Sequence, residues 1–449
     1  MIQRLLIANR GEIAVRIIRA CRELGIETVA VYSEADADAR HVREADIAVA
    51  IGPAPARESY LAVAKIIAAA RATGAQAVHP GYGFLSERAP FARACEEAGL
   101  IFVGPPASAL EKMGSKIGAR RLMAAAGVPI VPGETPADQS DGSLRTTIER
   151  VGYPALIKPA AGGGGIGMKV VRGANEIADA LTAARREARA SFGDDTLYVE
   201  RLIERPRHVE IQVFADAHGH TVHLFERECS AQRRQQKTVE ESPCTALGPA
   251  VRERMGAAAI AAATAVGYRN AGTCEFLLEG SGDTARFYFL EMNTRLQVEH
   301  GVTEDVTGVD IVKTQIRLAA GEKLSDVLPN APTVNGHAIE ARVYAEDPKR
   351  FFPSPGKLEV FRPPVSESVR IETGYREGLD VTPYYDPLLA KVIVKRATRD
   401  RAIDDLIEAL GVFEVRGVKS NIPALVTVLG SDEFRSGHVH TGLVGELIK

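Results

Sequence analysis

The chain has 449 residues, of which 45% are hydrophobic and 25% are charged, and its formal net charge at pH 7 is −3. This usage is ordinary for a soluble globular protein, and the length predicts roughly two to four domains rather than one. A net charge so close to zero gives no reason to expect a nucleic acid or an anionic membrane as partner.

Cysteine usage and hydropathy both point to the cytoplasm. The five cysteines are far apart and include no CxxC pair, which fits a reducing compartment and favours neither a disulfide framework nor a zinc site. The amino terminus is too short and too strand-like for a secretory signal. The longest weakly polar run, residues 256–267, is too short to span a membrane and is expected to be a buried helix.

Residues 1–114 alternate strand and helix patterns. Apolar runs predict strands at residues 5–8, 28–32, 47–50, 77–78 and 100–103, with helices between several of them. Repeated βα units of this kind predict a parallel sheet covered by helices. Asn9-Arg10-Gly11-Glu12 is not a GxGxxG fingerprint, so a Rossmann oxidoreductase is not supported. Residues 79–83 follow the end of a strand, where open α/β sheets bind ligands, although a tight turn explains them equally well.

A helix over residues 116–127 and an extended linker lead to a small unit with a glycine-rich loop. Five of the six residues 162–167 are glycine, and strands are expected on both sides of them. Backbone N–H groups of such a loop can surround a phosphate chain, and Lys158 can supply a positive charge. The loop lacks the GK[ST] ending of a Walker P-loop. A flexible surface turn is the alternative, but the glycine content favours phosphate binding.

Residues 207–214 alternate in polarity and are expected to form a hairpin with residues 221–225. In an extended strand His208, Glu210 and Gln212 would share one face. The stretch 226–237 is dense in charge. It is interpreted either as a solvated loop or as a group of basic residues around an anion.

A second hairpin, residues 272–279 with 287 onward, carries a file of polar residues. Strand alternation would put seven side chains on one face: Phe287, Phe289, Glu291, Asn293, Arg295, Gln297 and Glu299. If Glu279 pairs with Phe287, then Glu275 faces Glu291 at about 5 Å between Cβ atoms, and the carboxylates repel by roughly 3 kcal/mol. A proton or a cation must lie between them, and with an Asn293 oxygen this favours Mg²⁺ or Mn²⁺ over zinc. A solvated strand face is the alternative, and a register slip of one residue would remove the argument.

Taken together, the motifs resemble the biotin carboxylase family of the ATP-grasp superfamily. The resemblance is carried by residues 7–14, 79–87, Lys158 with its glycine loop, residues 207–210, 291–300 and 354–357. It implies a chain of α/β and α+β class with an ATP-grasp fold. The implied parts are an N-terminal parallel α/β domain (1–114), a helical linker (115–130), a mobile glycine-loop lid (131–203) and a C-terminal catalytic domain with a mixed β region (204–449).

The resemblance also implies an activity, in which MgATP and bicarbonate form carboxyphosphate and biotin on a carrier protein is then carboxylated. Two Mg²⁺ ions, replaceable by Mn²⁺, would be held by Glu275, Glu291 and Asn293. ATP would contact Glu275, Glu291 and a longer set of residues: Lys116, Lys158, Gly163, Gly164, Gly165, Glu200, Arg201, Leu202, Ile203, His208, Gln232, Gln235 and Leu277.

For the chemical steps, the resemblance implies four catalytic residues: Lys237, Arg295, Glu299 and Arg342. Glu299 would deprotonate bicarbonate, and Arg342 would stabilise the biotin enolate. Bicarbonate would be held by Lys237, Arg295, Gln297, Val298 through its backbone N–H, and Arg342. Biotin would meet Arg342, Tyr82 and Gly83.

Four positions depart from the family pattern: Ala161, Ile166, Gln235 and Gly301. The expected partners are a biotin carboxyl carrier protein and a separate carboxyltransferase, with acetyl-CoA the expected acceptor and fatty acid biosynthesis the expected setting. A homodimer is implied by Arg16, Arg19 and Glu23 on the first helix. Another ATP-grasp ligase and an inactive nucleotide-binding regulatory subunit are the two alternatives.

Overall fold

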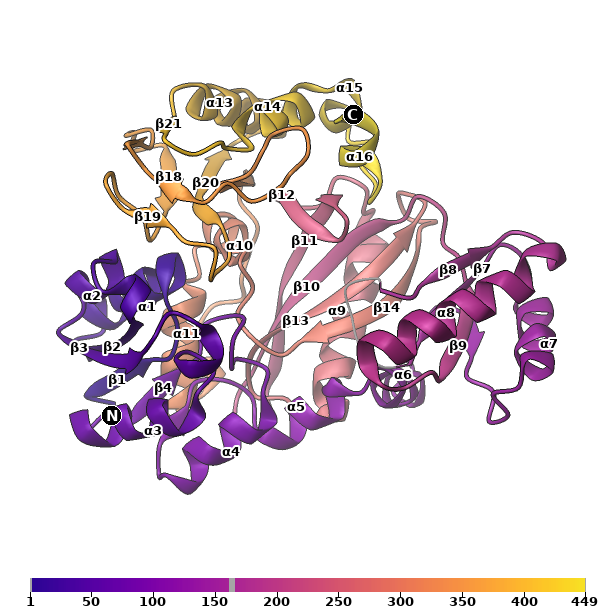
Figure 1. Ribbon diagram of the computed structural model, residues 1–449, viewed down its shortest axis with the longest axis horizontal. Coiled ribbons are helices and arrows are strands. Elements are labelled where there is room, and N and C mark those ends of the chain that lie inside the picture. The colour runs from indigo at the N-terminus through magenta and orange to yellow at the C-terminus, as the bar shows by residue number, and fades with distance from the viewer. Residues whose placement is uncertain (1, 161–165, 449) are drawn as a thin grey trace.

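The computed structural model describes residues 2–160 and 166–448 (Figure 1). The N-terminal part is a parallel five-stranded sheet in the order β3-β2-β1-β4-β5, as expected from the repeated βα pattern. Its apolar strands are covered by helices on both faces, the arrangement that a parallel sheet requires. The elements are β1 (Arg4–Ile7), α1 (Gly11–Glu23), β2 (Glu27–Ser33), η1 (Glu34–Asp36), α2 (Arg40–Glu44), β3 (Ile47–Gly52), η2 (Ala56–Glu58), α3 (Val63–Thr73), β4 (Ala77–His79), α4 (Ala89–Glu97) and β5 (Ile101–Phe102).

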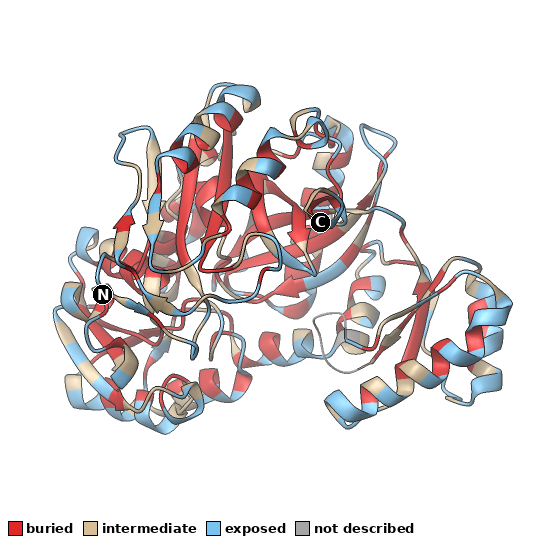
Figure 2. Ribbon diagram, turned by 45° about the horizontal axis from the view of Figure 1, so that its top comes forward, coloured by how far each residue is buried: buried red, intermediate tan, exposed pale blue. Residues whose placement is uncertain are grey.

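Two helices, α5 (Ala107–Gly114) and α6 (Lys116–Ala125), lead to a smaller unit that extends from the rest of the molecule in Figures 1 and 2. It has its own antiparallel sheet, in the order β6-β9-β7-β8, and its own apolar core. Lys158 lies on its strand β7. The elements are β6 (Gly133–Glu134), α7 (Asp141–Val151), β7 (Ala155–Pro159), β8 (Lys169–Val171), η3 (Ala174–Glu176), α8 (Ile177–Phe192) and β9 (Leu197–Arg201).

The centre of the molecule is an eight-stranded sheet in the order β14-β13-β10-β11-β12-β15-β20-β18, drawn largely as buried in Figure 2. Helix α9 (Pro249–Val266), the expected alanine-rich helix, packs on β10 and β11. The strands are β10 (Arg207–Ala215), β11 (Thr221–Arg233), β12 (Gln236–Ser242), β13 (Asn270–Glu279), β14 (Arg286–Asn293), β15 (His337–Tyr344), β18 (Val369–Glu372) and β20 (Leu388–Arg396).

Strand β11 corrects one expectation. The charge-dense stretch after residue 225 is not a solvated loop, because β11 continues to Arg233 and its Glu226, Arg227 and Glu228 are buried. These charges are tolerated because they are paired: the Arg227 guanidinium donates to Glu210 at 2.5 Å. Burial of a charge is otherwise very unfavourable.

Helices α10 to α12 connect β14 to β15 and pack in other apolar clusters, whereas the later elements close the C-terminal region around a core of its own. The remaining elements are α10 (His300–Thr307), α11 (Ile311–Ala319), α12 (Leu324–Val327), β16 (Gly356–Lys357), β17 (Val360–Arg362), β19 (Asp380–Val381), α13 (Arg399–Gly411), β21 (Glu414–Arg416), α14 (Ile422–Gly430), α15 (Asp432–Arg435) and α16 (Leu443–Leu447). Among the described residues, no helix combines the length and the apolar character that crossing a membrane requires.

Candidate functional site

The acidic pair expected in the second hairpin is present, but the hairpin reaches it by a different register. Glu279 pairs with Arg286 rather than with Phe287, and Phe276 pairs with Phe289. A β-bulge then adds one residue to β14, so that Glu275 does face Glu291. The bulge also reverses the alternation. Phe287 and Phe289 are therefore buried in the apolar core and do not share the face of Glu291, as the regular alternation had predicted.

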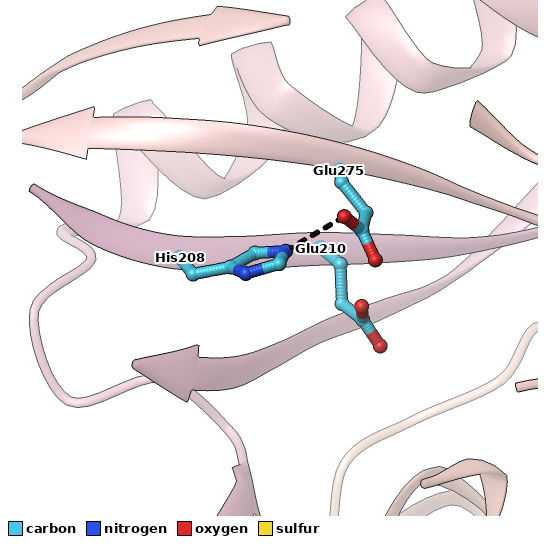
Figure 3. Close-up of side chains that lie close together, drawn as sticks. All are labelled: His208, Glu210 and Glu275. Carbon is cyan, nitrogen blue, oxygen red and sulfur yellow. Dashed lines mark ion pairs between the residues drawn. The ribbon is translucent and has the colours of Figure 1, made fainter. Parts of the chain in front are cut away.

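Glu275 has polar neighbours on strands β14 and β10 and on the loop that follows β14. Its Oε1 accepts from Asn293 Nδ2 at 2.7 Å and from Gln297 Nε2 at 3.2 Å, and its Oε2 lies 3.0 Å from His208 Nε2 (Figure 3). Asn293 thus turns its amide nitrogen, not its oxygen, toward this carboxylate. Burial alone would raise the pKa of Glu275, but Lys237 and His208 hold that pKa well below its usual range.

Lys237 is the cation shared by three buried carboxylates. Its Nζ lies 2.7 Å from Glu210, 2.8 Å from Glu275 and 2.6 Å from Glu299. Burial alone would lower the pKa of Lys237, but these acidic neighbours raise it well above the usual value. The amine therefore stays protonated and neutralises part of a strongly acidic site.

Glu299 lies between two cations at the end of the loop that follows β14. Its Oε1 contacts Lys237, and its Oε2 accepts from Arg342 Nη2 at 2.7 Å. The same guanidinium nitrogen lies 2.5 Å from Glu240. Burial opposes ionisation of Glu299, yet Lys237 and Arg342 lower its pKa well below the usual value. The carboxylate is thus ionised and able to accept a proton.

Arg295 extends along the same loop and is held by oxygen acceptors. Its Nε donates to Glu87 at 3.1 Å, its Nη1 to Gln297 Oε1 at 3.0 Å, and its Nη2 to Asn293 Oδ1 at 3.2 Å. Residues 294–299 are not strand. The polar file therefore continues as an irregular segment that leads into α10, with Val298 in the turn.

A second cluster lies where the small unit meets the central sheet. Lys158 Nζ ion-pairs with Glu200 Oε1, and Arg120 Nη1 lies 3.4 Å from Glu200 Oε2. On the other side of β9, Arg201 contacts Glu279 at 2.9 Å and the Tyr288 hydroxyl at 2.8 Å. Two basic side chains, Lys158 and Arg120, are thereby gathered around one buried carboxylate.

Many of these groups line one cavity of about 790 Å³ between the small unit and the central sheet. A smaller cavity of about 260 Å³ shares Lys158, Glu200, Glu291 and Asn293 with it. Most of the residues expected at the site line the larger cavity: Lys158, Glu200, Arg201, Leu202, Ile203, His208, Gln232, Gln235, Lys237, Glu275, Leu277, Glu291, Asn293, Arg295, Gln297, Val298, Glu299 and Arg342.

The other expected residues lie elsewhere or outside the description. Tyr82 and Gly83 do not line the cavity, and the Tyr82 hydroxyl donates to Glu12. Lys116 is the first residue of α6. Gly163, Gly164, Gly165 and Ala161 lie outside the described residues.

Four residues of the site were given no role from the sequence: the buried Glu210, Arg227 and Glu240 and the exposed Glu87. Glu210 shares the face of His208 (Figure 3), and the alternation of β10 was a usable signal for it. Glu87 was part of a recognised motif. Arg227 and Glu240 gave no local signal, because their partners come from distant parts of the chain.

Family models match most of the chain. The model described as "Biotin carboxylase, N-terminal domain" matches residues 1–110. "Carbamoyl-phosphate synthase L chain, ATP binding domain" matches residues 115–327, and "Biotin carboxylase C-terminal domain" matches residues 340–446.

Two curated relatives match at half identity. A biotin carboxylase of Halalkalibacterium halodurans is 50% identical over 449 residues, which is 100% of this chain and 98% of the relative. The mitochondrial methylcrotonoyl-CoA carboxylase subunit alpha of Rattus norvegicus is 50% identical over 445 residues, which is 99% of this chain and 62% of that protein.

Solved structures of biotin carboxylases are also similar to this chain. A Campylobacter jejuni biotin carboxylase complex with beta-gamma-ATP is 42% identical with a TM-score of 0.94, covering 99% of each chain. The biotin carboxylase domain dimer of Hydrogenobacter thermophilus 2-oxoglutarate carboxylase, in complex with MgADP, ADP and bicarbonate, is 44% identical with a TM-score of 0.92, covering 99% of this chain and 98% of that one. With an identity of 50% over the full length, an ATP-grasp fold and a cavity that gathers the expected residues, this chain belongs to the biotin carboxylase family of ATP-dependent carboxylating ligases.

Proposed function

We propose that this chain uses MgATP and bicarbonate to carboxylate biotin on a carrier protein, through carboxyphosphate. The observation that carries the proposal is the position of Glu299. Its buried carboxylate lies between Lys237 and Arg342, next to the Arg295–Val298 loop and in the same cavity as the Glu275–Glu291 pair. A base, two cations and an acidic pair therefore face one space.

The donor set at the acidic pair fits Mg²⁺ or Mn²⁺. Glu275 and Glu291 face each other across the hairpin, and carboxylate oxygens are ligands that these hard cations prefer. The Asn293 amide, whose oxygen accepts from Arg295, would have to turn to offer that oxygen to a metal ion. When bound there, metal ions would neutralise phosphate charge. For their part, Lys158 and His208 would contact the phosphates, and residues 200–203 would hold the adenine.

Bicarbonate would occupy the loop before α10. Arg295, Gln297, Lys237 and the Val298 N–H would surround the anion, and Glu299 would take its proton, since a positioned carboxylate can act as a general base. The resulting nucleophile would attack the γ-phosphate. Because Glu299 is held by two cations, its proton affinity is low until one of them turns to the substrate.

Arg342 would act in the second step. CO₂ released from carboxyphosphate would be attacked by the biotin enolate, and a fixed cation stabilises such charge as it develops. Arg342 is buried, and its pKa is raised well above the usual value because Glu240 and Glu299 outweigh the effect of burial. It therefore remains charged. Tyr82 and Gly83, which do not line this cavity, would meet the biotin ring.

Partners and acceptor are proposed at a coarser level. We infer a carrier protein and a separate carboxyltransferase, and acetyl-CoA remains the acceptor we favour, although the relatives act in carboxylases of several acceptors. A homodimer is also proposed, in line with the dimer named for the Hydrogenobacter domain. Arg19 and Glu23 are 43% and 48% exposed, so a partner could reach them although they pair with Glu372 and Lys313 of their own chain. Arg16 is not, because it is buried and pairs with Glu304 and Asp310 of its own chain.

The test is ATP cleavage by the purified chain with bicarbonate, with and without free biotin. We expect slow bicarbonate-dependent cleavage that biotin accelerates, with N-carboxybiotin as product. A rate of bicarbonate-dependent ATP cleavage that does not change when biotin is added would support a different ATP-grasp ligase. ATP binding without any cleavage would support the regulatory alternative.

A further inference from the structure

The turn at residues 297–299, between β14 and α10, presents backbone to the cavity. Val298 lines the cavity wall, while Gln297 and Glu299 on either side of it are buried. None of the hydrogen bonds recorded for the described part of the chain uses the Val298 N–H. This amide is therefore a free donor beside Arg295 and Glu299.

The carbonyl of Gln297 belongs to the same peptide unit as the Val298 N–H, and it is hydrogen-bonded to the His300 side chain. The Nδ1 of this fully buried imidazole lies 2.7 Å from the Gln297 carbonyl oxygen. Because a carbonyl oxygen only accepts, Nδ1 carries the proton. Burial, together with the nearby charge of Lys391, lowers the pKa of His300 to about 3, so the ring is neutral and donates through Nδ1.

Peptide planarity links this contact to the cavity. The C=O of Gln297 and the N–H of Val298 belong to one trans peptide unit and point in opposite directions. Fixing the carbonyl against His300 therefore fixes the N–H on the other side, away from the imidazole.

The next peptide is held in the same way. Lys391, fully buried on β20, donates from Nζ to the Val298 carbonyl at 2.7 Å. It also lies 3.4 Å from Glu12, which accepts from the Tyr82 hydroxyl. Two successive peptide planes are thus fixed by buried side chains, and the turn is organised before any anion arrives.

We propose that His300 is a positioning residue for bicarbonate: by holding the Gln297 carbonyl it aims the Val298 N–H at the anion, with Lys391 fixing the following peptide. The inference rests on the proposed function, in which that N–H donates to bicarbonate. A donor that is already oriented stabilises an anion without reorganisation, whereas a free turn would have to be ordered on binding.

Two substitutions of His300 by neutral amide side chains distinguish a positioning role from a role in packing alone. In His300→Asn the side-chain nitrogen falls near the place of Nδ1 and can still donate to the Gln297 carbonyl. In His300→Gln it falls near the place of Nε2, for which no hydrogen-bond partner exists among the described residues. A purely structural role would not rank these two variants by the position of one N–H.

The experiment is steady-state kinetics on the full-length chain and both variants, with bicarbonate and ATP varied separately. For His300→Gln we expect the KM for bicarbonate to rise about tenfold and the KM for ATP to change less than about twofold, while His300→Asn stays within roughly threefold of the parent on both, as loss of one hydrogen bond to a charged group implies.

Four outcomes contradict the inference in different ways. Equal KM values for bicarbonate in the two variants, or KM values for ATP that rise in parallel, overturn the positioning role alone. If His300→Gln does not fold, His300→Asn decides, because a bicarbonate KM more than about tenfold above the parent is incompatible with a retained donor. Absence of bicarbonate-dependent turnover in the parent chain overturns the proposed function, and the inference with it.

Discussion

Glu299 is the residue on which the proposed chemistry depends most. Glu299→Gln keeps the shape of the side chain but removes the proton acceptor, so bicarbonate-dependent ATP cleavage should fall by roughly 10²- to 10⁴-fold. ATP affinity, measured by calorimetry, should be nearly unchanged, because the ATP-binding residues proposed do not include Glu299. The exposed Glu367→Gln is the matched control. Cleavage at the parental rate would remove Glu299 from the base role.

Arg342 should separate the two half-steps. In Arg342→Met the long apolar stem remains while the charge that would stabilise the enolate is lost. We expect biotin carboxylation to fall at least about tenfold further than the slow ATP cleavage without biotin, in line with the loss of one fixed charge at a developing anion. Both rates are measured on the same preparation, with the exposed Arg401→Met as control. An equal loss of both activities would argue against a biotin-specific role.

Individual site residues can be predicted from the sequence when they belong to a short local pattern. Glu291, Asn293 and Arg295 stand two positions apart, and their file indicated a site before any partner was known. Arg227 could not be found in this way. Its guanidinium contacts Glu210, Gln212, Thr273 and Thr303, and no local spacing relates residues so far apart in the chain.

At the scale of the elements, Glu241 links strand β12 to strand β15 and helix α13. From β12 it accepts from His337 of β15 at 2.6 Å and from Arg399 of α13 at 2.6 and 2.9 Å. Burial alone would raise its pKa, but these two partners lower it to about 2, below the value of about 4.3 in an unfolded chain. The carboxylate therefore stabilises the fold above the unfolded pKa, and this stabilisation is lost as the pH falls from about 4.3 toward 2.

Glu241→Gln leaves His337 and Arg399 without their anion, so it should cost about 3 kcal/mol at pH 7. The urea midpoint of the variant should lie below that of the parent at pH 7, and the gap should persist to about pH 4.3 and narrow as the pH is lowered from there toward 2. Glu414→Gln, at an exposed pair with Arg416, should cost less than about 1 kcal/mol. A gap that widens at lower pH would contradict the assigned sign.

Element types were largely predictable, because apolar periodicity decides them, but registers were not. The β-bulge between Phe289 and Glu291 has no sequence signal, since a bulge depends on how two strands fit rather than on the residue inserted. The assumed register was off by one residue at the turn, and the bulge cancels that error at Glu275. The expected facing of Glu275 and Glu291 is thus confirmed from an incorrect register, while the metal site stays a prediction.

The whole molecule combines an N-terminal parallel sheet, a central eight-stranded sheet and a smaller unit with a sheet of its own. Residues 131–203 have their own sheet and core. Near their boundaries they meet the body through the Phe289 N–H, which donates to the Pro129 carbonyl at 2.7 Å, and through Arg201 with Glu279 and Tyr288. A unit with its own core and few ties is suited to rigid-body closure over a ligand.

Closure should be visible as a change of size. MgATP, supplied as a non-hydrolysable analogue, would draw Lys158 and the body residue His208 toward the same phosphates, so the radius of gyration measured by X-ray scattering should decrease. Lys158→Met removes the charge on the small unit's side and should weaken this decrease at the same nucleotide concentration. Lys169→Met, on the neighbouring strand and paired with Glu187 at 2.7 Å, is the control and should close like the parent. An unchanged radius of gyration, with calorimetry showing the nucleotide bound, would mean that residues 131–203 are already closed without nucleotide or do not move.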